Sequence, residues 1–517
     1  MQRLGAALGL ALLYASAYFL PLLNPYALYF VPAFYDFVLF PSLISVLVLV
    51  PLFLYISSAR VTMRARRVSV FCGAVLLIFI AAKSLLDAAG FPWTSLLTLY
   101  NRGSAVEQLQ FARWARLAIV GLSMPAAAFG VFLLRQRLPQ LLRFLSTLGY
   151  AFVCLAIYRC ASGELQVHPL QRAVAQAEVA PLPPVARRVV WVIFDEMDYH
   201  RSLGTEAFDL PNFARLRDRG VTATEAYTPG RDTLYSVPAL LSGIAVKGIE
   251  LSRRQALSLT AVDGASVPFD TAHSVFGRLP GGVQSASVLG FYHPYCRILT
   301  ALRACHSSYL GNAGRWFDSL VFFSDAGMSV LRFLKWPIQY MPEVLLRAVD
   351  PMYRATDTTL ALLGPTLADL HSAFDFIHLN VPHLPNVYAQ RLLRQQAVDQ
   401  GAAYRQNLQL ADRVLGTIVT TLQAQSGSQK ILLIVSSDHW LRTASSTAAP
   451  VPFTAWLVGA GVDQAQVLTA PLSTVHTATL AIDFLDGTLD SQAAIANALA
   501  ASPFSPTWLA PDNYRYY

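Results

Sequence analysis

The sequence predicts an N-terminal all-α transmembrane bundle of about five helices, followed by an α/β domain with a largely parallel central sheet. Before residue 160 the chain repeats apolar segments of membrane-spanning length. After residue 188, short runs rich in Val and Ile alternate with stretches of helical periodicity, as in a parallel sheet covered by helices. We therefore divide the chain into a transmembrane domain over 1–160, a linker over 161–187 and a second domain over 188–517.

The composition agrees with a chain that has a membrane part and a soluble part. Of its 517 residues, 54% are hydrophobic and 14% are charged, which is too apolar for a purely soluble protein. The formal net charge of +8 comes largely from arginines beside apolar spans, so we expect no nucleic-acid partner. Cys296 and Cys305 either form a disulfide, if their segment lies outside the cytoplasm, or are two inert thiols.

The first part contains five candidate membrane spans. They are Leu4–Leu23, Phe37–Ile56, Val68–Ala89, Leu117–Leu134 and Leu141–Tyr158. Arginines cluster in the loops of one side, whereas the loop from Asn24 to Asp36 has no Lys or Arg. By the positive-inside rule the N-terminus is cytoplasmic and everything past residue 160 is outside. The first segment is alternatively a cleaved signal peptide, with a small-residue site at Ala15-Ser16-Ala17.

Two further segments have a distinctive composition. Residues Ala161–Arg188 are polar and pass through P-L-P-P, which favours an extended connector. Trp316–Met352 mixes aromatic residues and leucines with Arg332 and Lys335. This segment is either an amphipathic element on the membrane surface or a buried pair of inserted helices.

Polar side chains gather at the ends of three predicted strands of the second domain. Asp195 and Glu196 follow Val189–Phe194, His378 and His383 lie at and just after the end of Phe374–Leu379, and Asp438 and His439 follow Ile431–Val435. Open α/β sheets build their sites at the carboxyl ends of strands. Carboxylates with imidazoles suit one divalent metal ion, Zn²⁺ or Mn²⁺. An acidic residue can simply end a strand, but three such groups at one sheet edge favour a metal site.

A nucleophile is available in T-P-G-R-D-T-L-Y-S-V-P-A-L-L-S-G, from Thr228 to Gly243. Leu234–Leu241 is predicted to start a short helix, in which Pro238 requires an early position. A Thr233 hydroxyl at that helix N-terminus would lie where backbone N–H groups attract an anion, and metal coordination would activate it. A helix-capping threonine is the alternative interpretation.

These motifs, taken together, resemble the alkaline-phosphatase/sulfatase superfamily, and within it the membrane-anchored phosphoethanolamine and glycerol-phosphate transferases, including lipoteichoic-acid synthases. The resemblance runs in order through V-V-W-V-I-F-D-E, L-P-N-F-A-R-L-R-D-R-G-V, T-L-Y-S-V-P-A-L-L-S-G, H-L-N-V-P-H-L-P, the helical pattern Tyr404–Leu422, S-S-D-H and V-P-F-T-A-W-L-V-G-A-G-V. It covers most of residues 188–490, and five preceding membrane helices also match the transferases. It implies an alkaline-phosphatase-like fold for the second domain.

The resemblance also implies roles for individual residues. The metal ligands would be Glu196, Thr233, Asp438 and His439, with Asp195 as a further ligand, and Thr233 would be the covalent nucleophile. His378 and His383 match the histidines that hold the phosphoryl group or protonate the leaving group. The chain departs from the family at Trp440, where Gly is common, and at Tyr292–His306, which has no counterpart, although we expect His293 to face the substrate. Threonine at 233 cannot be converted to formylglycine, which argues against sulfatase chemistry of that type.

We therefore expect a metal-dependent enzyme that transfers a phospho-head-group, phosphoethanolamine or glycerol phosphate, through a phosphothreonine intermediate. The donor would be a phospholipid and the acceptor a cell-envelope glycan or glycolipid. The protein would lie in the bacterial inner membrane, with its catalytic domain on the periplasmic side. Two alternatives stay open, namely a phosphodiesterase or sulfatase-like ester hydrolase with water as acceptor, and a catalytically silent protein that binds the envelope.

Overall fold

The structure is a computed structural model. It describes residues 2–19, 40–56, 62–88, 129, 132, 135–161, 184–204, 206–251, 256–308, 351–383, 400–442, 448–502 and 504. The chain divides into two compact units, whose described parts are the helices up to residue 161 and the residues from 184 onward.

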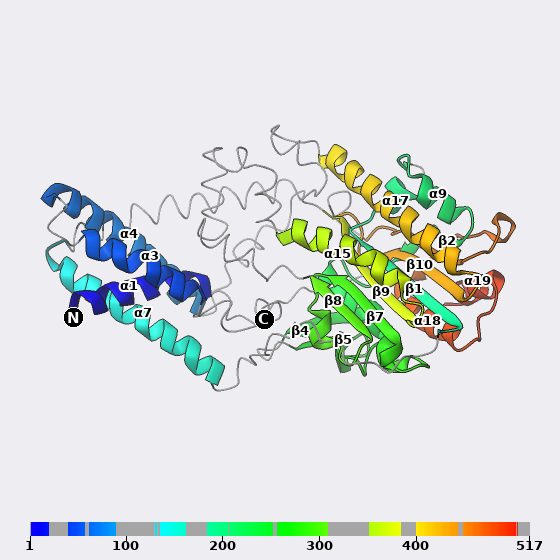
Figure 1. The fold of residues 1–517 in the computed structure, drawn as a ribbon, viewed down its shortest axis with the longest axis horizontal. Coiled ribbons are helices and arrows are strands. Elements are labelled where there is room, and N and C mark those ends of the chain that lie inside the picture. Colours follow the sequence, from blue (N-terminus) through cyan, green and yellow to red (C-terminus); the bar gives the residue numbers. More distant parts are fainter. Residues whose placement is uncertain are drawn as a thin grey trace. The chain divides into compact units, whose positions relative to one another are not determined.

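The described part of the first unit is helical (Figure 1). It comprises α1 (Gln2–Phe19), α3 (Phe40–Ile56), α4 (Met63–Ala88), the short 3-10 helix η3 (Arg135–Arg137) and α7 (Leu138–Ala161). Helix α1 contacts α3, α4 and α7. Two glycines allow a close approach between α1 and α7, since a Cβ on Gly149 would overlap the carbonyl oxygen of Gly9.

Within the described residues, one helix is long and apolar enough to cross a membrane, namely Leu138–Tyr158 in α7. Shorter apolar stretches, Leu4–Ser16 and Ser45–Ile56, lie in α1 and α3. The predicted span Leu117–Leu134 lies outside the described residues, apart from residues 129 and 132. The five-helix transmembrane bundle therefore stays a prediction.

The second unit is built on an eight-stranded sheet of order β12-β2-β11-β10-β1-β9-β7-β8. Its strands are β1 (Arg187–Asp195), β2 (Val221–Ala223), β7 (Ala286–Phe291), β8 (Ala304–Ser308), β9 (Phe374–Pro382), β10 (Lys430–Ser437), β11 (Phe453–Leu457) and β12 (Gln466–Leu468). Strand β11 runs antiparallel to its neighbours β10 and β2, and all the other pairs are parallel. The predicted α/β domain with a largely parallel sheet is confirmed.

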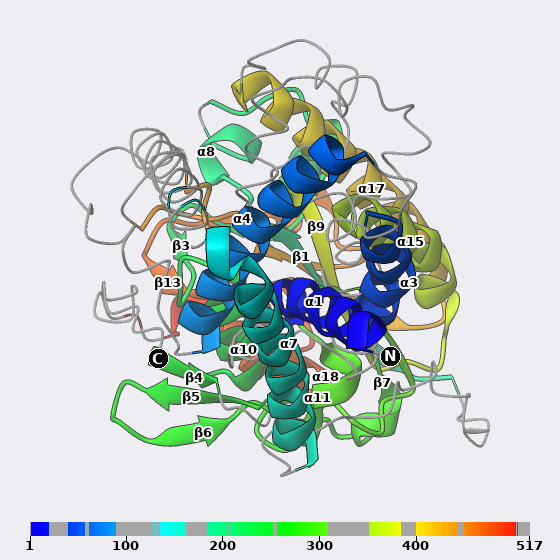
Figure 2. The same ribbon diagram turned by 90° about the vertical axis from the view of Figure 1, so that its left-hand side faces the viewer.

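Two smaller sheets accompany the large one. Strands β4 (Val246–Leu251), β5 (Leu257–Ala261) and β6 (Ser266–Pro268) form an antiparallel sheet, and Figure 2 shows these strands side by side. In the other small sheet, β3 (Ala226–Tyr227) pairs with β13 (Leu472–Ser473). The helices of this unit are α8 (Tyr199–Ser202), α9 (Pro211–Arg217), α10 (Thr233–Ser242), α11 (Tyr295–Ile298), α15 (Pro351–Ala368), α17 (Gln400–Gln425), α18 (Thr477–Leu485) and α19 (Gln492–Ala500). Short 3-10 turns are η4 (Val275–Arg278), η5 (Val283–Ser285), η7 (Val462–Gln464) and η8 (Thr474–His476).

Helices cover both faces of the central strands. Helices α15 and α17 contact β9, and alternate residues of β1, Val190, Val192 and Phe194, belong to the same hydrophobic core as the apolar side of α17. The other face of β1 contacts α18, which in turn contacts α10. Burial on both faces explains the continuous apolar runs Val189–Phe194 in β1 and Ile431–Val435 in β10, whereas β9 also buries Asp375, His378 and Asn380.

The predicted elements agree with the structure in position and differ in detail. The predicted strands at 189–194, 374–379 and 431–435 correspond to β1, β9 and β10, and the predicted helix Tyr404–Leu422 corresponds to α17. The candidate strand Pro452–Val458 is β11, the antiparallel member. Residues 162–183 of the linker, and Trp316–Met352 up to the first two residues of α15, lie outside the described residues.

Candidate active site

Strand parity brings three of the predicted site residues to one face of the sheet. Side chains alternate between faces along a strand, and Ile193 pairs with His378 on one side and with Ser436 on the other. The side chains of Ile193, His378 and Ser436 therefore lie on the same face of the sheet. Asp195 and Asp438 follow Ile193 and Ser436 by two residues, so they project to this face as well, on the side of α10 and α18. His378 lies inside β9, because that strand continues to Pro382, and not at a strand end as predicted.

Helix α10 delivers Thr233 to the same place. Asp232 caps the helix by accepting a hydrogen bond from the N–H of Tyr235, and Gly243 ends it with a φ of 69°. Thr233 is thus the first helical residue, where N–H groups without intrahelical partners face outward. Pro238 is the sixth residue of the helix, later than predicted. All ten residues of α10 are buried, so surrounding side chains fix the position of its N-terminus.

Four ligand-type atoms form a compact ring at this point. The Thr233 hydroxyl donates to Asp438 Oδ2 at 2.8 Å and lies 3.5 Å from Asp195 Oδ1. His439 Nε2 lies 3.3 Å from Asp195 Oδ1 and 3.6 Å from Asp438 Oδ2. Four ligands that each lie about 2.0–2.2 Å from a tetrahedral metal are separated by about 3.3–3.6 Å from one another. Three of the four ring distances, 3.3, 3.5 and 3.6 Å, agree with this spacing, and the fourth, 2.8 Å between Thr233 Oγ1 and Asp438 Oδ2, is that of a hydrogen bond.

The histidines in this region have buried nitrogens without a hydrogen-bond partner. His439 Nδ1 lies 3.0 Å from the carbonyl of Trp440, an acceptor, so Nδ1 carries a proton and Nε2 is the nitrogen that faces the ring. His378 Nε2 is buried and makes no hydrogen bond among the described residues; the same holds for His439 Nε2, although two carboxylates lie 3.3 and 3.6 Å from it. Leaving such atoms unpaired is costly, and a metal or substrate would satisfy them. The donor set of carboxylates, a hydroxyl and an imidazole suits Zn²⁺ or Mn²⁺.

The ring residues also perturb one another electrostatically. Burial opposes ionisation of Asp195, but the charges of His383 and His439 outweigh it and lower its pKa. Burial and the neighbouring Asp195 raise the pKa of Asp438 to about 7. Burial disfavours the charged form of His439, yet the two carboxylates raise its pKa to about 9. A cluster whose members shift one another's pKa values in this way is typical of a functional site.

Glu196 contacts a second group of side chains beside the ring. Its φ of 61° is in the left-handed region, so its side chain departs from the strand alternation that directs Asp195. Its Oε1 accepts from Arg442 Nε at 3.2 Å, and its Oε2 lies 3.5 Å from His383 Nε2. Arg442 also lies 3.1 Å from His383 Nε2. The geometry thus favours Asp195 over Glu196 as the carboxylate ligand from β1, and joins Glu196 to His383 through Arg442.

The remaining histidines approach the site from two sides. His383 follows β9 and is partly exposed, whereas His378 is buried, with its Nδ1 at 2.8 Å from the hydroxyl of Tyr295. Burial lowers the pKa of His378 to about 4, so its ring is neutral. His293 does not line an exposed surface, because it is fully buried and donates from Nε2 to the carbonyl oxygen of Thr233 at 2.9 Å.

Sequence reasoning missed three residues that support the site. They are Arg442, Tyr295 and Tyr404, whose hydroxyl donates to the carbonyl of Glu196 and accepts from the N–H of Asp198. Arg442 had a usable signal, since it lies three residues after His439 in D-H-W-L-R. The two tyrosines had none, because their partners are remote in the sequence.

Comparison with known proteins gives structural neighbours alone. No protein-family model and no curated protein matches the sequence. Similar solved structures include a phosphonate monoester hydrolase from Silicibacter pomeroyi, with 13% identity, a TM-score of 0.38 and coverage of 64% of this chain and 78% of that one. A sulfatase from Pseudoalteromonas sp. has 14% identity, a TM-score of 0.37 and coverage of 64% and 73%.

A third similar structure is a protein in the alkaline phosphatase superfamily from Vibrio parahaemolyticus, with 11% identity, a TM-score of 0.34 and coverage of 63% and 72%. Sulfatases and phosphonate monoester hydrolases belong to the superfamily that the motifs of the second domain resemble. Because these TM-scores lie below 0.5, the substrate and reaction of this chain have to be inferred from its own residues.

Proposed function

We propose that the chain is a membrane-anchored, metal-dependent phosphotransferase of the alkaline phosphatase superfamily, which uses Thr233 as its nucleophile. The observation that carries this proposal is the ring of Thr233 Oγ1, Asp195 Oδ1, Asp438 Oδ2 and His439 Nε2. It combines a hydroxyl, a hydrogen-bonded carboxylate and metal-ligand spacing at a helix N-terminus. The donor would be a phospholipid whose head group is phosphoethanolamine or glycerol phosphate.

Each residue has a role in the first half-reaction. The four ring residues would hold one divalent ion, which would lower the pKa of the hydroxyl and stabilise charge on the phosphoryl oxygens. Thr233 Oγ1 gives up its proton toward Asp438 Oδ2 and attacks phosphorus. The bond from phosphorus to the diacylglycerol oxygen breaks, which leaves the phospho-head-group on Thr233 as a phosphothreonine.

The histidines serve the leaving group and the phosphoryl oxygens. His383 is partly exposed beside Glu196, and would protonate the departing diacylglycerol oxygen. His378 is neutral and buried, and would contact a phosphoryl oxygen through Nε2. In the second half-reaction a hydroxyl of an envelope glycan or glycolipid would attack phosphorus and lose its proton to His383. The bond from phosphorus to Thr233 Oγ1 would break, and Thr233 would recover its proton from Asp438 Oδ2.

Two features support a place at the outer side of a membrane. Large exposed apolar side chains concentrate in the first unit, and include Leu47, Phe144 and Tyr158, each at least 60% exposed. Such side chains suit a lipid environment. The second unit contains the Cys296–Cys305 disulfide, so the disulfide alternative is confirmed in this structure. Stable disulfides are typical of the periplasm and other oxidising compartments.

Intact mass spectrometry of the purified protein with candidate phospholipids tests the nucleophile. We expect wild type and Thr233→Ser, which keeps a hydroxyl, to gain the mass of one phospho-head-group, and Thr233→Ala to gain none. The mass increment identifies the donor. Equal lipid turnover by wild type and Thr233→Ala would show that Thr233 is not the nucleophile.

A labelled lipid with an envelope extract then tests the acceptor. The transferase predicts label on a glycan or glycolipid. Release of the free phospho-head-group without such an adduct would instead establish a phosphodiesterase that uses water.

A further inference from the structure

Two side chains outside the ring contact residues of the site, one a ring member and the other a neighbouring histidine. His293 Nε2 donates to the main-chain carbonyl of Thr233 at 2.9 Å, and the hydroxyl of Tyr295 lies 2.8 Å from Nδ1 of His378. Both His293 and Tyr295 are completely buried. Through these contacts His293 acts on the proposed nucleophile and Tyr295 on the neutral histidine.

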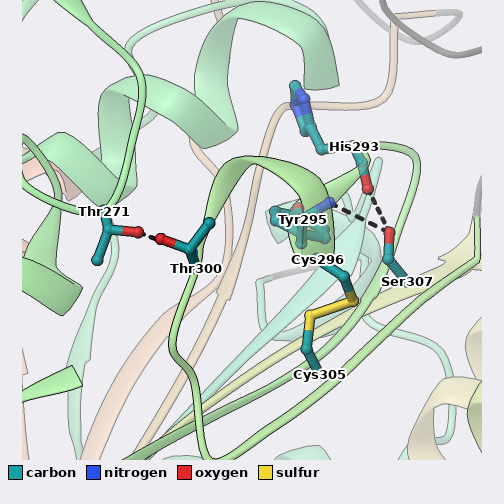
Figure 3. Close-up of a disulfide and its surroundings, with 7 residues drawn as sticks. All are labelled: Thr271, His293, Tyr295, Cys296, Thr300, Cys305 and Ser307. Carbon is teal, nitrogen blue, oxygen red and sulfur yellow. Dashed lines mark hydrogen bonds between the residues drawn. A yellow bond between two sulfur atoms is a disulfide. The ribbon is translucent and has the colours of Figure 1, made fainter. Parts of the chain in front are cut away.

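Both residues belong to the segment from Tyr292 to Ser308. A disulfide joins Cys296 in α11 to Cys305 in the edge strand β8. Ser307 in β8 donates to the carbonyl of His293 at 2.5 Å, and its hydroxyl accepts from the N–H of Tyr295 at 3.3 Å (Figure 3). One covalent bond and two hydrogen bonds therefore tie the residues that support the site to a strand of the sheet.

Two positions in or beside this segment, Tyr292 and Gly290, have backbone conformations or surroundings that most side chains would not tolerate. Tyr292 has a φ of 75°, a region that side chains other than glycine rarely adopt. Gly290 lies directly beneath the ring of Tyr295, so that a Cβ at this position would overlap the ring. Unfavourable backbone geometry persists only where the surrounding structure maintains it, and such positions are concentrated at functional sites.

We propose that His293 and Tyr295 are positioning residues for the reaction, and that the Cys296–Cys305 disulfide keeps them in place. Full activity then requires the oxidised protein. The inference rests on the proposed function in one respect, which is the role of Thr233 as nucleophile. It goes further because it assigns a role to Tyr292–His306, a segment that has no counterpart in the family that the sequence resembles.

The expected size of the effect follows from the geometry. Loss of a group that orients a ligand or catalytic side chain typically lowers metal affinity or activity by about 10–100-fold. A displacement of about 1 Å at a reacting atom can cost roughly 100-fold in rate. Because His293 and Tyr295 do not touch the substrate, the loss should appear in kcat and leave KM nearly unchanged.

The first test uses the full-length protein with a chromogenic phosphodiester, bis(p-nitrophenyl) phosphate. We expect Tyr295→Phe and His293→Leu to lower kcat by about 10–100-fold, with KM changed by less than about twofold. His293→Gln should recover most of the activity, since its amide can donate to the same carbonyl. Tyr227→Phe, which removes a hydroxyl bonded to Glu225, is the matched control.

The second test breaks the disulfide. The double variant Cys296→Ser with Cys305→Ser, and wild type reduced with a phosphine, should show the same loss of kcat as Tyr295→Phe. Replacing Cys72, a free cysteine, by serine is the control and should have no effect. The inference is overturned if Tyr295→Phe and His293→Leu melt like wild type and keep kcat within about twofold, or if the reduced protein remains fully active.

Mn²⁺ binding to the same variants separates failure of this inference from failure of the proposed function. If wild type cleaves no phosphodiester, the proposed function fails, but the metal site can still be measured. We then expect His293→Leu to bind Mn²⁺ about tenfold more weakly, because the Thr233 hydroxyl is one of the four ring atoms, and His293→Gln to restore binding. Equal Mn²⁺ affinity in wild type, His293→Leu and the reduced protein would overturn the inference.

Discussion

Replacement of Asp438 by asparagine removes one oxygen of the proposed metal site and should leave the rest of the site in place. Asp438 Oδ1 accepts from the N–H of Glu196 at 3.1 Å and from the N–H of His439 at 2.9 Å, which an asparagine oxygen can also do. Oδ2 is the atom that meets Thr233 Oγ1 and the ring. In Asp438→Asn an amide nitrogen, which has no lone pair to offer a metal, takes the place of Oδ2.

The expected loss of metal affinity can be worked out from the number of ligands in the proposed site, which is four. Structural zinc sites bind with apparent free energies of about 10–16 kcal/mol, so each of four ligands accounts for about 2.5–4 kcal/mol. One lost ligand should therefore weaken metal binding by roughly 100-fold or more, at about 1.4 kcal/mol per factor of ten. The same variant should lose phosphodiester cleavage, because the carboxylate that accepts the Thr233 proton is absent.

Metal analysis and competition with a chelator measure this affinity. The matched control is Asp412→Asn, since Asp412 is also buried but accepts hydrogen bonds from the N–H groups of Asn212 and Phe213 at the start of α9. The control should retain metal affinity. If Asp438→Asn bound metal as tightly as Asp412→Asn, the ring would not be the metal site.

Three further predictions concern the framework of the site. Arg188→Met should lower the free energy of unfolding by about 3–5 kcal/mol, because it leaves the fully buried Asp375 without its ion-pair partner. Asp369→Asn should destabilise the protein at pH 7. Burial alone would raise the pKa of Asp369, but an arginine partner lowers it, so the contribution is present above pH 3.8 and is lost as the pH falls below that value. Gly290→Ala should lower kcat about 10–100-fold by displacing the ring of Tyr295.

Chemical unfolding measures the first two of these predictions, and phosphodiester cleavage measures the third. An Arg188→Met protein as stable as wild type would contradict the assigned cost of the unpaired carboxylate. A stability deficit of Asp369→Asn that does not shrink in acid would contradict the pKa assignment. Gly248→Ala is the control for the glycine variant, because a Cβ there meets nothing closer than 3.8 Å.

The strands that carry the ring could be predicted because they are buried on both faces. That environment leaves continuous runs such as V-V-W-V-I-F, whose ends mark the sheet edge where sites form. Asp195, Asp438 and His439 follow directly from this rule. Thr233 was found because a turn, a hydroxyl and a helical pattern occur together.

Other features depend on contacts that local sequence does not encode. The direction of β11 is decided by which neighbours it pairs with, and the sequence of an antiparallel member resembles that of a parallel one. Glu196 has a left-handed φ, which takes its side chain out of the strand alternation. Its carboxylate contacts Arg442 and His383, whereas that of Asp195 contacts Thr233 and His439, a difference that the sequence does not reveal. His378 appeared to end a strand because Asn380 and Pro382 look like the start of a turn, whereas β9 includes both.

The hydrogen bond between His439 Nδ1 and the carbonyl of Trp440 has a consequence for how such a site can vary. The acceptor is a main-chain atom, so exchange of the residue at 440 leaves the bond available whatever side chain is present. Mutation of residue 440 should therefore leave the orientation of the His439 imidazole unchanged. A screen of single substitutions at position 440 would therefore not reveal that this residue orients the proposed metal ligand His439.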